Sequence, residues 1–123
     1  MPLATLADAP TFAREGFTFR SLAVPSRGSA ELAVWALEAA PGACSEPHSL
    51  DREEVFVVAA GTLTATVGDE RHALAAGDAL IVPPGTPLQL ANDGAETARL
   101  TVCTSAGMRA RLNGEAFTPP WAQ

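Results

Sequence analysis

The sequence contains no lysine, and all of its positive charge comes from eight arginines scattered through 123 residues. The 14 acidic residues outweigh them and give a formal net charge of −6. Nucleic acids and anionic membranes both require clustered positive charge on a binding protein. Because no basic run occurs in the chain, the composition argues against both kinds of partner.

Long apolar segments are also missing. No stretch approaches the ~18 apolar residues of a membrane-spanning helix. Residues 1–17 have neither a basic n-region nor a long apolar h-region, so they do not resemble a signal peptide. We therefore expect a cytoplasmic protein. Cysteine is scarce, and Cys44 and Cys103 are expected to be free thiols in that reducing compartment.

Glycine and proline, by contrast, are frequent, with ten of each. They divide the chain into short segments rich in Val, Leu, Thr and Phe, a pattern typical of an all-β sandwich or barrel. Strands are predicted at residues 17–24, 31–39, 54–59, 62–67, 71–75, 79–82, 87–92 and 98–104. The segment TLTATV alternates and places Leu63, Ala65 and Val67 on one buried face. The Gly68-Asp69 pair that follows predicts a tight hairpin.

The chain has the length of one ordinary domain. We expect a barrel core at about residues 17–105, an N-terminal arm at 1–16 and a C-terminal tail at 106–123. No helix is predicted, apart from a turn within residues 2–14 or 108–112.

The tail carries two prolines and two large aromatic residues. Pro119 and Pro120 exclude regular structure there. Phe117 and Trp121 are large enough to dock the tail onto the barrel, and a frayed terminus is the alternative.

Two spaced patterns of glycine, proline and polar residues occupy the middle of the chain. The first consists of Gly42, His48, Glu54 and Gly61, and the second of Gly77, Pro83, Gly85 and Asn92. Their spacing resembles the two motifs of the cupin superfamily, which are small β-barrels. The resemblance implies an all-β jelly-roll barrel, also called a double-stranded β-helix, and it implies a homodimer. It does not fix the function, because one fold hosts many activities.

The sequence departs from the family pattern at two positions. A typical metal-binding cupin uses three histidines and one glutamate as ligands, and here only His48 and Glu54 match. Leu50 and Leu88 stand where the other two histidines are expected. Leucine has no lone pair, and catalytic metal sites usually offer three protein ligands. We therefore predict a degenerate metal site and no bound cofactor.

Substitute ligands are the alternative. Glu46 shares a strand face with His48 by the two-residue period. Cys103 can reach the cavity if its position on the last strand faces inward. A divalent transition metal held by His48 and Glu54, with Glu46 or Cys103, would support an oxygenase or isomerase.

The leading functional prediction is a cupin that binds a small organic molecule with one polar end in a largely apolar cavity. The residues predicted to form this site are His48, Leu50, Glu54, Phe56, Leu88, Leu90, Glu46 and Cys103. A further possibility is metal-free acid–base catalysis, since His48 and Glu54 are residue types that transfer protons. The sequence leaves open whether the protein is an enzyme.

Overall fold

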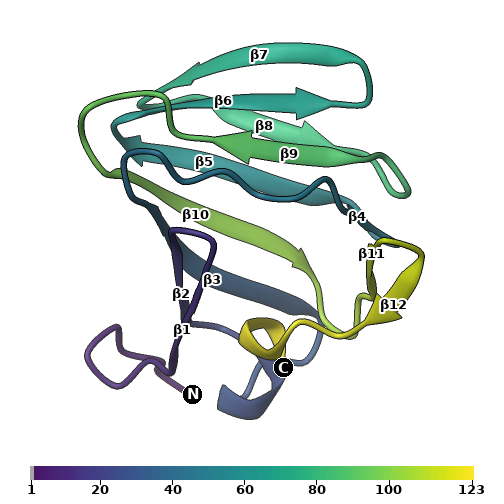
Figure 1. The fold of residues 1–123 in the computed structure, drawn as a ribbon. Helices are drawn as coiled ribbons and strands as arrows, with labels where there is room; N and C mark the ends of the chain where they lie inside the picture. Colours follow the sequence, from purple (N-terminus) through teal and green to yellow (C-terminus); the bar gives the residue numbers. More distant parts are fainter. Residues whose placement is uncertain (1) are drawn as a thin grey trace.

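The computed structural model describes residues 2–123, most of them in strands and turns (Figure 1). The strands are β1 (Thr11–Arg14), β2 (Phe17–Ser21), β3 (Leu32–Ala39), β4 (Ser49–Leu50), β5 (Glu54–Ala60), β6 (Thr62–Val67), β7 (Glu70–Ala75), β8 (Ala79–Val82), β9 (Leu88–Ala91), β10 (Ala98–Ser105), β11 (Ala110–Leu112) and β12 (Glu115–Phe117). Two 3₁₀ turns, η1 (Pro25–Arg27) and η2 (Pro120–Ala122), complete the elements. Within this described part of the chain, no helix is long and apolar enough to cross a membrane.

The strands form one large sheet and two small ones. The six-stranded sheet has the order β1-β2-β3-β10-β5-β8, and the three-stranded sheets have the orders β7-β6-β9 and β12-β11-β4. Antiparallel bridges join Cys44 to Ala91 and His48 to Leu88, so the segment leading into β4 lies beside β9. The prediction of an all-β fold is confirmed.

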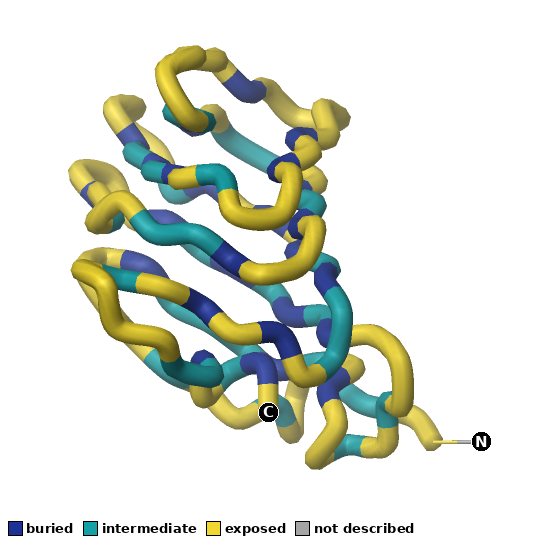
Figure 2. Tube along the Cα trace, turned by 90° about the vertical axis from the view of Figure 1, so that its right-hand side faces the viewer, coloured by how far each residue is buried: buried dark blue, intermediate teal, exposed yellow. Residues whose placement is uncertain are grey.

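Alternating side chains place the core between the large and small sheets. In β3 the buried residues include Trp35 and Leu37, and in the paired strand β10 they include Leu100 and Val102. Phe56 of β5 lies opposite Val102 on the same inward face. Burying each large apolar side chain contributes about 1.5–3 kcal/mol. Figure 2 shows the resulting alternation of buried and exposed positions along the strands.

Two glycines allow the chain to reverse tightly between strands. Gly61 has φ +78°, and a Cβ atom there would lie 2.8 Å from Cα of Ala98, so only glycine fits between β5 and β6. Gly68 and Asp69 form the two-residue connection between β6 and β7, which confirms the predicted hairpin.

Asn92 fastens the loop after β9 to the end of β3. Its side chain is 1% exposed. The Nδ2 group donates to the backbone oxygens of Ala39 and Glu96, both at 2.9 Å, and Oδ1 accepts from the Gly94 N–H at 2.9 Å. An asparagine is suited to this place because one amide both donates and accepts.

A turn is present within residues 2–14, where the Ala9 N–H donates to the backbone oxygen of Leu6 at 3.2 Å. The turn expected within residues 108–112 is wrong, and neither segment is helical. Residues 11–14 form β1, which pairs with β2 through a turn in which Glu15 and Gly16 both have positive φ. Residues 110–112 form β11, between β4 and β12. Cross-strand pairing, which local sequence does not reveal, determines the structure of both segments.

The C-terminal tail docks onto the large sheet. The rings of Trp121 and Phe19 stack with centroids 3.8 Å apart and planes 12° apart. The Ser21 hydroxyl donates to the backbone oxygen of Trp121 at 2.7 Å. The prediction that the prolines exclude regular structure is wrong, because the short 3₁₀ turn η2 forms there. Pro120 occupies its first position, where proline is tolerated.

Candidate functional site

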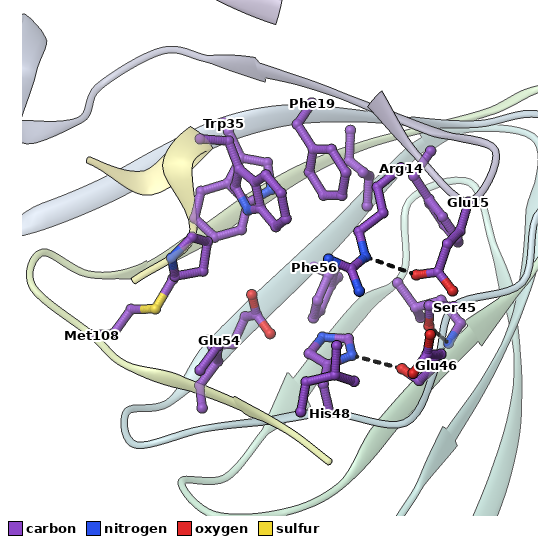
Figure 3. Close-up of a pocket in the computed structure, with 18 of the residues that line it drawn as sticks. Arg14, Glu15, Phe19, Trp35, Ser45, Glu46, His48, Glu54, Phe56 and Met108 are labelled. Atoms are coloured by element: carbon purple, nitrogen blue, oxygen red, sulfur yellow. Dashed lines mark hydrogen bonds and ion pairs between the residues drawn. The ribbon is translucent and has the colours of Figure 1, made fainter. Parts of the chain in front are cut away.

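A cavity with a volume of about 80 Å³ lies between the large sheet and the small sheets (Figure 3). Its walls come from β2, β3 and β5 on one side and from β9, β11 and the segment before β4 on the other. The C-terminal tail and the end of β1 complete it. A single water molecule needs about 10–15 Å³ by this kind of measure, so the space holds several waters or a small organic group.

Aromatic side chains are concentrated around this cavity. The chain has five Phe, two Trp and no Tyr, and six of these seven aromatic residues line the cavity. They are Phe17, Phe19, Trp35, Phe56, Phe117 and Trp121. Such walls offer flat apolar surfaces to a ligand ring.

The cavity has a buried end and a charged mouth. Trp35 and Glu54, which are 3% and 4% exposed, lie at the buried end. Arg14, Glu15 and Glu46 are exposed and lie on the opposite side of the cavity in Figure 3. The Arg14 Nε atom pairs with Oε1 of Glu15 at 3.1 Å. Polarity therefore changes along the cavity, from charged groups at the mouth to aromatic walls deeper inside.

Glu54 is a buried carboxyl group at the first position of β5. Its side chain points into the cavity in Figure 3. Burial away from water raises its pKa from the ordinary value of 4.5 to about 8. The carboxyl group is therefore mostly neutral near pH 7, and as a neutral acid it can donate one hydrogen bond as well as accept.

His48 lies on the facing wall and is half-buried. Its Nδ1 atom lies 3.1 Å from the backbone oxygen of Glu46. Because a carbonyl oxygen only accepts, Nδ1 carries the hydrogen, and Nε2 of the neutral ring is left as an acceptor. The ring is thus oriented by the backbone of its own segment, not by Glu54.

The structure brings together most of the residues that the sequence predicted for the site. Those that line the cavity are His48, Leu50, Glu54, Phe56, Leu90 and Glu46. Leu88 does not line it. It is 1% exposed and lies opposite His48 in an antiparallel bridge, so it is buried beside His48 without bordering the cavity.

Cys103 does not reach the cavity either. The inward positions of β10 include Val102 and Thr104, so Cys103 between them faces the outer side of the sheet. Cys103 was expected at the site only if its position on the strand faced inward, and it faces outward. Both Cys44 and Cys103 are free cysteines.

Sequence reasoning missed the residues that reach the cavity from outside the two motifs. Arg14 and Glu15 arrive through the β1–β2 hairpin, and Met108 and Trp121 arrive through the C-terminal part of the chain. The Glu15-Gly16 pair was an available turn signal. Trp35 lies within the strand predicted at residues 31–39, and the two-residue period of a strand puts it on the same face as Leu37.

The chain belongs to the cupin family. A family model of the Cupin domain matches residues 35–104, which is more than half of the sequence. A search of the curated proteins found no match.

Several solved structures, among them cupins, share the fold of this chain. The polyketide cyclase RemF from Streptomyces resistomycificus superimposes with a TM-score of 0.81 at 20% identity, covering 98% of this chain and 88% of that one. An RmlC-like cupin from Shewanella frigidimarina gives a TM-score of 0.73 at 19% identity, covering 85% of this chain and 90% of that one. A sugar phosphate isomerase from Silicibacter pomeroyi gives 0.73 at 20% identity, covering 93% and 83%. At these identities the likeness establishes the fold alone.

The side chains present do not fit the metal set that the family implies. Among residues 2–123, no three His, Cys, Asp or Glu side chains come together as a possible metal site. Leu50 and Leu88 supply apolar groups beside His48. The Glu46 carboxylate accepts a hydrogen bond from Nδ2 of Asn113 at 3.3 Å, at the mouth. Two remaining donors are fewer than a transition metal ordinarily needs.

Proposed function

We propose that the protein binds a small, largely apolar organic molecule in this cavity without the help of a metal ion. The observation that carries the proposal is the gathering of six of the seven aromatic residues around one cavity that also holds a buried carboxyl group. Ligand sites are mostly apolar and contain a few polar groups that fix the orientation of the ligand.

The size of the cavity limits the ligand. Pockets for drug-sized molecules measure about 300–1,000 Å³, whereas this one measures about 80 Å³. A single-ring aromatic compound is therefore the appropriate first probe. Any larger ligand would extend through the mouth, past Arg14 and Glu15.

A second candidate function, metal-free acid–base catalysis, is favoured by one observation. His48 and Glu54 line the same cavity from facing walls. A general acid and a general base must both lie within reach of a bound substrate. Recovery of the bound molecule in unchanged form would identify binding alone.

Ala110→Phe is expected to weaken the binding of single-ring aromatic compounds. Ala110 lines the cavity and is 2% exposed, so an added ring occupies the ligand space. We expect the affinity for ethylbenzene, measured by calorimetry, to fall at least about tenfold, which corresponds to about 1.4 kcal/mol. Overpacking costs about 1–3 kcal/mol of stability, so Leu112→Trp at the half-buried mouth serves as a second blocking variant.

The matched control is Ala116→Phe. Ala116 lies on the neighbouring strand β12, is exposed and does not line the cavity. This variant is expected to bind ethylbenzene as the wild type does. Equal binding by Ala110→Phe, Leu112→Trp and the wild type would refute the cavity as the binding site.

We further propose that two copies pair through the outer face of the six-stranded sheet. Ile81, Val55, Cys103 and Val34 lie in register across β8, β5, β10 and β3 on that face. Ile81 is 61% exposed. A two-fold interface must be complementary to itself, and the uncharged row formed by these four residues meets that requirement. Arg20, Glu38 and Arg99 form ion pairs elsewhere on the same face.

Ile81→Glu is expected to convert a dimer into a monomer. Light scattering after size exclusion should give twice the 12.7 kDa chain mass for the wild type and the single chain mass for the variant. A charge placed in the apolar row of the interface has to be desolvated on pairing. Ala73→Glu, at an exposed position of β7, is the control that should remain dimeric. A monomeric wild type would contradict the proposal.

A further inference from the structure

The indole N–H of Trp35 is buried without a hydrogen-bond partner. Among the side-chain nitrogen and oxygen atoms of residues 2–123, Nε1 of Trp35 is the buried one left unpaired. Trp35 is 3% exposed and lines the cavity. Buried polar groups in native proteins are nearly always paired, and an exception calls for an explanation such as a missing water or ligand.

The strand register brings this donor and Glu54 to the same end of the cavity. Trp35 lies opposite Val102, and Val102 lies opposite Phe56, so one inward row crosses β3, β10 and β5. Glu54 is the next inward position along β5. Figure 3 shows the Trp35 ring and the Glu54 carboxyl group on the same side of the cavity. A ligand atom at this end is therefore close to two polar groups in otherwise apolar surroundings.

The charges around the cavity restrict what that ligand atom can be. The arginine that lines the cavity, Arg14, is exposed at the mouth. The polar groups at the buried end are a neutral donor and a carboxyl group, and neither compensates a negative charge. A neutral acceptor oxygen, such as that of a ketone or an aldehyde, satisfies the indole N–H without bringing a buried charge.

We propose that the buried end of the cavity is an oxygen subsite, in which the indole N–H of Trp35 donates to the carbonyl oxygen of a small aromatic carbonyl compound. The ring of this compound lies against Phe19, Phe56 and Trp121. The inference rests on the proposed function, since it assigns the ligand class of the same cavity. Without ligand, water is able to occupy the subsite, and the carbonyl oxygen replaces its hydrogen bond.

Acetophenone and ethylbenzene are a matched pair of probes, because they differ in a carbonyl group in place of a methylene group. The quantity to measure is the ratio of their affinities, by calorimetry, in the wild type and in two variants. Trp35→Phe removes the unpaired N–H, whereas Trp121→Phe removes the other indole of the cavity, which stacks on Phe19. Using the ratio within each variant cancels the difference in hydrophobicity between the probes and any general loss of packing.

Trp35→Phe is expected to shift the ratio about tenfold toward ethylbenzene, the effect of roughly one hydrogen bond. Trp121→Phe is expected to weaken both probes alike and leave the ratio unchanged. In ¹H–¹⁵N spectra the chain has two indole signals, one for each Trp, and the signal that remains in Trp121→Phe belongs to Trp35. Acetophenone should move this proton downfield in the wild type, and ethylbenzene should not.

The outcomes separate the inference from the function on which it rests. Binding of both probes with the same ratio in the wild type and in Trp35→Phe would overturn the oxygen subsite and leave the binding function standing. An unmoved Trp35 indole proton in the wild type would do the same, even if Trp35→Phe fails to fold. No binding of either probe to the wild type would overturn both.

Discussion

Relative to the wild type, the Glu54→Gln variant is expected to gain about 4 kcal/mol of unfolding free energy from pH 5 to pH 9. The pKa of Glu54 rises from 4.5 to about 8 because the carboxyl group is buried. Between these two values the folded state holds a proton that the unfolded state has released, so raising the pH favours unfolding. Protonated Glu54 contributes fully to the free energy of unfolding below pH 4.5, and this contribution is lost as the pH rises to about 8.

Urea unfolding of both proteins across this range measures the effect. Glutamine keeps the shape of the side chain and does not titrate, so the difference between the two stability curves isolates Glu54. Glu53→Gln, at the exposed neighbouring position, is the control and should follow the wild type. Parallel curves for the wild type and Glu54→Gln would mean that the carboxyl group ionises as freely in the folded protein as in the unfolded one.

The double variant Leu50→His, Leu88→His is expected to gain a transition-metal site that takes up about one Zn²⁺ per chain. Leu50 lines the cavity with His48 and Glu54. Leu88 lies directly opposite His48 in an antiparallel bridge, and residues in such pairs project to the same face. Two imidazoles at these positions would join the two donors already present.

Equilibrium dialysis against Zn²⁺, followed by elemental analysis, measures the uptake. The control is Leu50→Asn with Leu88→Asn, which introduces polar groups at the same positions without imidazoles. If the histidine variant bound no more Zn²⁺ than the asparagine variant, the expectation would be contradicted. Leucine at positions 50 and 88 would then not be the reason that this cavity lacks a metal site.

Much of the fold could be predicted from the sequence because its strands alternate and its turns carry glycine. All eight predicted strands exist, with bounds shifted by at most three residues at either end. The short strands β1, β4, β11 and β12 were not predicted. β1 and β12 belong to tight local hairpins with β2 and β11, whereas β4 exists only through pairing with the distant strand β11. The docking of the tail was one of two alternatives, and the stacking of Trp121 on Phe19 decides it.

The candidate site was only partly predictable for the same reason. Residues within the two motifs, such as His48 and Glu54, follow from spacing. The mouth residue Arg14 and the buried residue Met108 come from the two ends of the chain, and only the three-dimensional fold brings them to one cavity. The phase of Cys103 depended on which face of β10 turned inward, and the outward phase removes it from the site.

Elemental analysis of the protein purified without chelator or added metal tests the central claim most directly. The claim is that the cupin frame is kept while the metal site has been replaced by an apolar, ligand-binding cavity. This account predicts a transition-metal content near zero per chain, with acetophenone binding unaffected by dialysis against a chelator. About one transition metal per chain, lost in His48→Ala together with ligand binding, would contradict it.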